Sequence, residues 1–188
     1  MTKGKMPDRV LVTGFGSFGQ FIPNPSTEVA RILGDNSAQP PHVIEVSFAA
    51  VDSFVDQLDP TTFDRWLMLG ATAHSDRMRV ERVARNRVGA LPDVRGIVRG
   101  PAEIDAGSGE ALPGTLWDSV HPSDSDGWAW SDDAGDYLCN YLYWRALRRF
   151  PQKRIGFVHV PPAERMPITK QLEVARELLR RVRVESLT

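Results

Sequence analysis

The sequence has little cysteine, no long apolar run and almost no net charge. Cys139 is the one cysteine among 188 residues, so no disulfide can form within the chain, and we expect a reducing, cytoplasmic location. Residues 1–7, which we expect to be flexible, lack the apolar run of a secretory signal. No stretch approaches the ~18 consecutive apolar residues of a membrane span. A formal net charge of -1 gives no general attraction to nucleic acid or to acidic lipid.

Several common site motifs are also missing. The four histidines, His42, His74, His121 and His159, show no paired spacing with one another or with the cysteine, which argues against structural zinc. The chain has neither the G-x-S-x-G elbow of serine hydrolases nor a Walker phosphate loop. We therefore expect no metal and no cofactor.

The apolar pattern alternates between strands and helices. A chain of this length suits one domain, residues 1–188. Strands are expected at 9–13, 42–48, 65–70 and 154–160, with helices at 25–33, 51–58 and 168–182. This order predicts the α/β class, as a single-domain three-layer α/β/α fold with a mostly parallel twisted central sheet. In such folds ligands gather at the carboxyl ends of the strands.

A glycine-rich loop follows the first strand. Gly14 to Gly19 fits the G-x-G-x-x-G pattern of dinucleotide sites, but there the helix opens within the glycines. Here Asn24 is expected to cap a helix whose first residue is Pro25, which begins too late for that role. We favour a loop that directs Phe15 and Phe18 toward a ligand, with a purely structural role of both rings as the alternative.

Two polar residues stand in otherwise apolar or alternating strands. His159 lies at the carboxyl end of the strand 154–160, where a catalytic histidine would stand in an α/β sheet. Glu81 interrupts an alternating strand expected at 78–88, although a strand glutamate is usually just solvated. The irregular segment 91–113 is expected to be a long excursion over the domain.

The stretch 131–140 contains Cys139. Asp132 or Asp133 is a plausible N-cap, and a helix beginning near Ala134 would place Cys139 in its second turn. The positive end of the helix dipole would then favour the thiolate over the thiol. The alternative is a small apolar residue in a buried helix face.

Five motifs in order carry a resemblance to pyroglutamyl peptidase I, a family of cysteine peptidases. They are Val12–Gly19, Asn24–Ser26, Val80–Asn86, Ser131–Asn140 and Gly156–Pro161. The resemblance covers about Val10 to Val182. It implies an exopeptidase that removes an N-terminal pyroglutamyl residue from blocked peptides through a thioester.

The family resemblance implies a role for particular residues. Cys139 would be the nucleophile, His159 the general base and acid, and Glu81 the group that orients the histidine. Substrate would be bound by Phe15, Phe18, Tyr137, Leu138 and Leu91. A homo-oligomer, dimer or tetramer, is also implied.

Two loops depart from the family pattern. Residues 70–77 replace a glycine-rich turn, and residues 86–93 are one residue short and lack an arginine near Ala90. These changes bear on substrate preference and rate. They leave open a catalytically silent or regulatory homologue that binds small molecules, and a cysteine amidase for another cyclic acyl group.

Overall fold

The structure is a computed structural model that describes residues 9–35, 40–118, 120 and 127–182. The segment 1–7 that we expected to be flexible lies outside these ranges. The helices are α1 (Pro25–Gly34), α2 (Phe48–Gln57), α3 (Leu138–Arg149) and α4 (Ile168–Arg181), with a short 3-10 turn at Pro60–Thr62. The strands are β1 (Val10–Phe15), β2 (His42–Ile44), β3 (Arg65–Ala71), β4 (Met78–Glu81), β5 (Val83–Arg85), β6 (Ala111–Pro113), β7 (Trp128–Ser131) and β8 (Arg154–Val160).

One six-stranded sheet forms the middle of the molecule, in the order β2-β1-β3-β8-β4-β7. Strands β2, β1, β3 and β8 run parallel. Strand β4 pairs antiparallel with β8 and parallel with β7, so the sheet is mixed at one side. The predicted α/β fold with a mostly parallel central sheet is confirmed.

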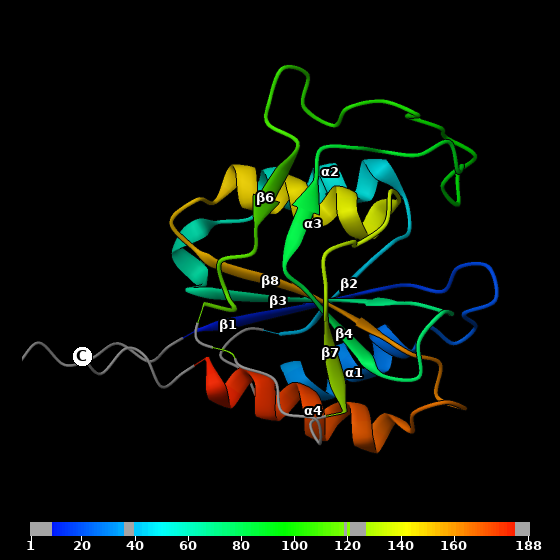
Figure 1. Cartoon of the computed structure of the whole chain (residues 1–188), viewed down its shortest axis with the longest axis vertical. Coiled ribbons are helices and arrows are strands. Elements are labelled where there is room, and N and C mark those ends of the chain that lie inside the picture. The colour runs from blue at the N-terminus through cyan, green and yellow to red at the C-terminus, as the bar shows by residue number, and fades with distance from the viewer. Residues whose placement is uncertain (1–8, 36–39, 119, 121–126, 183–188) are drawn as a thin grey trace, which may run out of the picture.

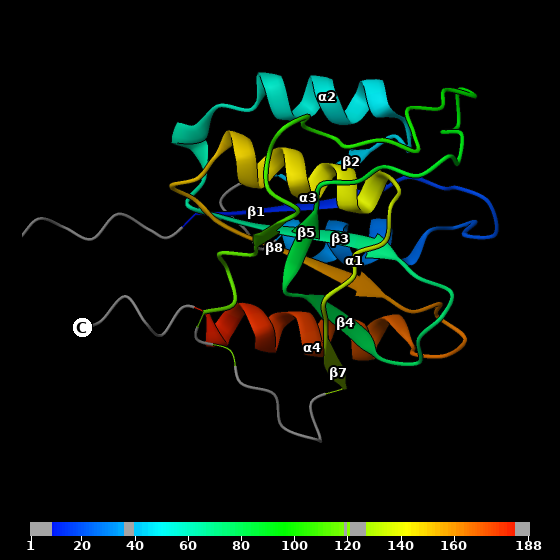
Figure 2. The same cartoon turned by 45° about the horizontal axis from the view of Figure 1, so that its top comes forward.

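Helices cover both faces of this sheet. Figures 1 and 2 show α2 and α3 on one side of the strands and α1 and α4 on the other. The apolar side chains form two clusters, one beneath α2 and α3 and one beneath α1 and α4. None of the helices in the described ranges is long and apolar enough to cross a membrane.

Strand β8 shows how the alternation of side chains divides the two faces. Ile155 and Phe157 belong to the cluster under α2 and α3, whereas Val158 and Val160 belong to the cluster under α1 and α4. Successive residues of a strand point to opposite faces. His159 therefore points toward the α2/α3 side.

The start of α1 follows its local sequence. Asn24 has extended backbone angles, and its side chain accepts a hydrogen bond of 3.0 Å from the N–H of Ser26. Pro25 occupies the first helical position, where its missing N–H costs nothing. The predicted cap is confirmed, and with it the late start of the helix after the glycine loop.

The structure corrects two of the expected strands and adds a third that was not expected. Strand β2 ends at Ile44, because Ser47 already caps α2 through a 3.2 Å bond from the N–H of Ala50. The single strand expected at 78–88 is two strands, β4 in the main sheet and β5 paired with β6 in a separate ribbon. Strand β7 was not expected, and it adds an edge next to β4.

Candidate active site

Glu81 and His159 meet on the α2/α3 side of the sheet. In the antiparallel pair β4/β8, Arg79 lies opposite His159, and Glu81 lies opposite Phe157. The two residues are thus diagonal neighbours on one face, within reach of a long side chain. His159 Nδ1 lies 2.8 Å from Glu81 Oε1, in a buried contact.

Glu81 is fully buried, which excludes the alternative of a solvated strand residue. Its neighbour Val80 points into the opposite cluster, so the alternation of β4 turns Glu81 toward α3. Arg79 Nε lies 3.5 Å from Glu81 Oε1, and the hydroxyl of Tyr143 donates to the Glu81 carbonyl at 3.0 Å. Glu81 Oε2 has no hydrogen-bond partner within the described part of the chain. A buried carboxylate of this kind favours a positive charge beside it.

Cys139 lies nearer the helix start than we predicted. Helix α3 begins at Leu138 with Tyr137 as its N-cap, so neither Asp132 nor Asp133 caps it, and Cys139 is in the first turn. The N–H groups of a first helical turn have no acceptor within the helix. They can therefore donate to a negative charge that develops beside Cys139.

Gly70 makes room for the thiol against the sheet. It lies opposite His159 in the parallel pair β3/β8. A Cβ atom at this position would lie 2.7 Å from Cys139 Sγ and 2.8 Å from Phe157 Cζ. Glycine therefore lets Cys139 lie over the strand that neighbours His159.

The pKa of His159 depends on its contacts with Cys139 and Glu81. Burial of the His159 ring lowers its pKa, but the charge of Cys139, a hydrogen bond with it and the contact with Glu81 outweigh burial and raise the pKa to about 9. The imidazole is then protonated at neutral pH. A positive charge on His159 therefore lies beside Cys139.

A small cavity of about 120 Å³ lies beside Cys139. Four predicted binding residues line it: Phe15, Phe18, Tyr137 and Leu138. The rings of Phe18 and Tyr137 lie 5.2 Å apart. The lining is mostly apolar, and it opens onto the thiol.

Leu91 is the predicted binding residue that the structure does not bring to this cavity. Its side chain is 57% exposed on the loop after β5. The cavity is instead completed by Phe21, Asn24, Val46 and Ala71. The three-residue spacing of Phe15, Phe18 and Phe21 was a signal for Phe21. Asn24 was predicted to be a helix cap and belongs to one of the five motifs, but its sequence context gave no sign that it lines the cavity, and no signal in the sequence indicates Val46 or Ala71.

The shortened loop 86–93 adjoins the segment that leads to Cys139. The Tyr137 hydroxyl donates to the Pro92 carbonyl at 2.9 Å, and the Gly89 N–H donates to the Asp136 carbonyl at 2.6 Å. Ala90, which stands near the family's arginine position, is exposed. The loop thus supports the N-cap of α3 through backbone contacts.

A thiol next to a buried histidine–carboxylate pair is typical of the class of hydrolases that use cysteine as nucleophile. The described residues contain no group of three or more His, Cys, Asp or Glu side chains that could hold a metal ion.

Comparison with known proteins gives the family. The family model of pyroglutamyl peptidase matches residues 8–186, so the chain belongs to the pyroglutamyl peptidase family. The pyrrolidone-carboxylate peptidase of Streptococcus pneumoniae (strain 70585) is 30% identical over 169 residues, which are 81% of this chain and 78% of that protein. That of Brevibacillus brevis is 30% identical over 173 residues, 81% of this chain and 77% of the relative.

Solved structures agree with this assignment. The crystal structure of pyrrolidone carboxyl peptidase from Thermus thermophilus has a TM-score of 0.77 at 28% identity, and the match covers 92% of this chain and 99% of that one. Pyroglutamyl peptidase I from Bacillus amyloliquefaciens has a TM-score of 0.82 at 20% identity, with coverage of 95% and 96%. The second likeness supports the fold alone.

Proposed function

We propose that this chain is a cysteine peptidase that removes an N-terminal pyroglutamyl residue from peptides, with Cys139 as its nucleophile. The observation that carries the proposal is the apolar cavity of about 120 Å³ that opens directly onto Cys139 in a member of this family. A pyroglutamyl group is a closed lactam without a free α-amine. A pocket for it therefore needs no carboxylate to hold an ammonium group, and aromatic walls such as Phe15 and Phe18 suit it.

The reaction begins with attack of the Cys139 thiolate on the carbonyl carbon that follows the lactam. The carbonyl oxygen takes the negative charge, and backbone N–H groups of the first turn of α3 stabilise it. As the C–N bond breaks, His159 gives its proton to the departing amine, which leaves a thioester on Cys139. His159 then accepts a proton from water, whose oxygen attacks the thioester and releases pyroglutamate, and the thiolate–imidazolium pair is restored.

Glu81 acts through His159 and touches no reacting atom. Its contact of 2.8 Å with Nδ1 holds the ring with its other nitrogen free to face the thiol. Its negative charge stabilises the imidazolium form, which is the form that protonates the amine. Arg79 Nε lies 3.5 Å from the same carboxylate oxygen.

Hydrolysis of the dipeptide pyroglutamyl-alanine tests this function. We expect release of free pyroglutamate and alanine by the purified chain, and no release of alanine from acetyl-alanine at the same concentrations. A panel of other cyclic acyl-alanines separates this peptidase from an amidase of different specificity. Binding of pyroglutamyl-alanine without turnover would instead support the silent or regulatory homologue.

We also propose an oligomeric state and a cellular location for this chain. The family resemblance supports a homo-oligomer, a dimer or tetramer, and light scattering of the purified chain would measure its mass. A reactive free thiol works in a reducing compartment, which supports a cytoplasmic location. We propose no role in binding nucleic acid or membranes.

A further inference from the structure

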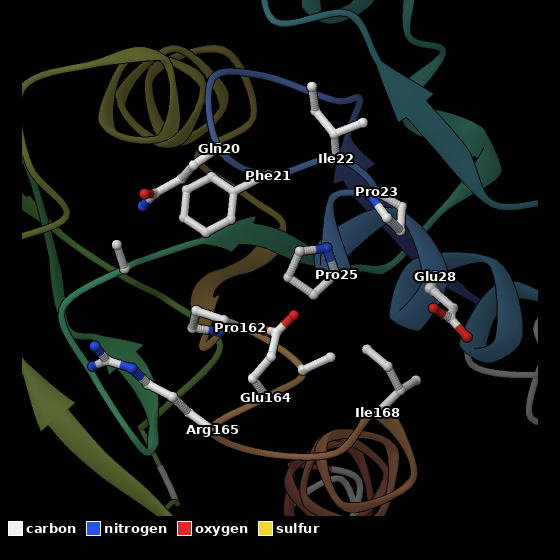
Figure 3. Close-up of a pocket in the computed structure, with 12 residues that line it drawn as sticks. Gln20, Phe21, Ile22, Pro23, Pro25, Glu28, Pro162, Glu164, Arg165 and Ile168 are labelled. Carbon is white, nitrogen blue, oxygen red and sulfur yellow. The ribbon is translucent and has the colours of Figure 1, made fainter.

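A second, larger hollow lies outside the site described so far. Its volume is about 420 Å³, and we call it the outer pocket. Its walls come from residues 20–28, from Ala73 in the loop after β3, and from residues 162–168 after β8. Figure 3 shows the labelled side chains of these segments around the hollow.

The outer pocket adjoins the cavity at Cys139. Phe21 lines both of them, so one aromatic ring forms part of each wall. Ala71 lines the cavity and Ala73 lines the outer pocket. Since a residue spans at most ~3.5 Å, the Cα atoms of these two alanines are within ~7 Å of each other. A peptide of a few residues can therefore extend from the thiol into the outer pocket.

The position of the departing amine indicates which part of the substrate can reach the outer pocket. The cavity is walled by Phe15 of β1 and by Val46, which follows β2, so a lactam bound there lies toward that side of the sheet. The departing amine has to meet His159 on β8 to receive its proton. Strand β8 leads within three residues from His159 to Pro162, which is part of the outer pocket. The chain beyond the scissile bond is thus directed toward this pocket.

We propose that the outer pocket binds the peptide segment on the leaving-group side of the scissile bond. The inference rests on the proposed peptidase function. In this proposal, loop residues 162–168 and the loop between β1 and α1 determine which residues are preferred after pyroglutamate. Peptides that extend beyond the second residue are then better substrates than a dipeptide.

The charges of the outer pocket favour a basic side chain in that segment. Figure 3 shows the Glu164 carboxylate directed toward the middle of the ring of labelled residues, while the Arg165 guanidinium lies at its margin. Glu28 adds a second carboxylate to the wall. Within the described ranges neither Glu28 nor Glu164 forms an ion pair, so both can attract a cation. The walls between them include Pro25 and Ile168, which suit the aliphatic part of a lysine.

The test compares kcat/KM for three substrates: pyroglutamyl-alanine, pyroglutamyl-Ala-Lys-Ala and pyroglutamyl-Ala-Glu-Ala. We expect the lysine peptide to be the best substrate. The variant Ala163→Trp, which places an indole in the pocket, should lower the ratio of tetrapeptide to dipeptide kcat/KM at least about fivefold. Glu164→Gln should lower the preference for lysine over glutamate about threefold, as an exposed charge pair allows.

Matched controls separate a local effect from a general one. Ala129→Trp places the same bulk at an exposed position of the edge strand β7, and it should leave the substrate ratios as they are in the unaltered chain. Arg165→Gln removes the neighbouring charge of opposite sign and should not reduce the preference for lysine. Equal ratios in the Ala163→Trp variant and the unaltered chain would overturn the outer-pocket assignment, even with full dipeptide hydrolysis. No hydrolysis of the dipeptide would overturn the peptidase function itself.

Discussion

The two faces of the central sheet are built from the same strands and differ in kind. Toward α1 and α4, residues such as Val80 and Val158 are buried in an apolar cluster. Toward α2 and α3, their chain neighbours Glu81 and His159 are buried as a polar pair. Because side chains alternate along a strand, a buried polar pair and an apolar cluster can lie back to back.

The buried polar pair and the apolar clusters should contribute to different properties, the pair to the catalytic rate and the clusters to the stability of the fold. Taking a carboxylate and an imidazole out of water has a desolvation cost that their attraction only partly offsets. A catalytic role therefore explains the burial of Glu81 and His159 better than a contribution to fold stability does. Substitutions of the buried polar pair should therefore change the rate, and those in the apolar clusters should change the free energy of unfolding.

The largest effect is expected at the thiol. Cys139→Ala should lower kcat for pyroglutamyl-alanine by roughly 10⁴-fold or more, because the nucleophile is removed. The midpoint of thermal unfolding should stay close to that of the unaltered chain, since Cys139 is only partly buried. Iodoacetamide should alkylate the native thiol rapidly at neutral pH. Slow alkylation together with surviving activity would mean that Cys139 is a structural residue.

The next largest effect is expected from alkaline pH. The rate should fall as pH rises through about 9, because His159 then loses the proton that the departing amine needs. The same group contributes to stability. Its pKa is raised in the folded state from 6.5, so its stabilisation is complete below about pH 6.5 and is lost as pH rises through about 9. NMR titration of the ring would measure this pKa, and a value at or below 6.5 would contradict the ion pair.

Removal of the Glu81 charge should have an intermediate effect. Glu81→Gln should reduce kcat roughly 10²-fold with little change in KM, because the imidazolium loses its carboxylate. It should also lower the pKa of His159 and slow alkylation of Cys139. Unchanged kcat and alkylation, both within about twofold, would show that another group orients the histidine.

A smaller effect on rate is expected at Gly70. The added methyl group of Gly70→Ala would lie 2.7 Å from Cys139 Sγ, so the thiol must shift, and kcat should fall about tenfold or more. Gly109→Ala is the matched control, since no atom lies within 4 Å of a Cβ there. Equal activity of both variants would show that the position of the thiol tolerates the displacement.

The smallest effect on rate is expected from the apolar face. Val158→Ala should lower the free energy of unfolding by about 2 kcal/mol through lost burial and a small cavity. The specific activity of the folded protein should stay within about twofold. Denaturant unfolding and kinetics of the same sample would check both numbers, and a large loss of kcat would show that the two faces are coupled.

Local sequence predicted the elements whose signals lie within a few residues. The apolar runs of β1, β3 and β8 and the cap of α1 by Asn24 are local features, and the structure confirms them. The division of strand 78–88 was not predictable in this way. Its second half pairs with β6, about 30 residues further along the chain, and no local pattern specifies that partner.

The start of α3 is the clearest case in which the structure depends on contacts between residues far apart in the sequence. Asp132 and Asp133 are good capping residues, but Asp132 accepts from Arg82 Nε at 2.6 Å and Asp133 from Arg87 at 2.7 Å. Both carboxylates have these partners outside α3, and the helix begins at Leu138 instead. As a result Cys139 is in the first turn, where the free N–H groups are.

The sequence by itself determined the α/β pattern and, through its five motifs, which cysteine, histidine and glutamate to consider. Only the tertiary structure decided that Glu81 is buried against His159, that Gly70 leaves space for the thiol, and that Phe21 lines both the outer pocket and the cavity at Cys139. The physical reason is the separation along the chain over which each effect acts. Periodicity and capping act over a few residues, whereas burial, pKa and pocket shape depend on side chains that the fold brings together from distant parts of the chain.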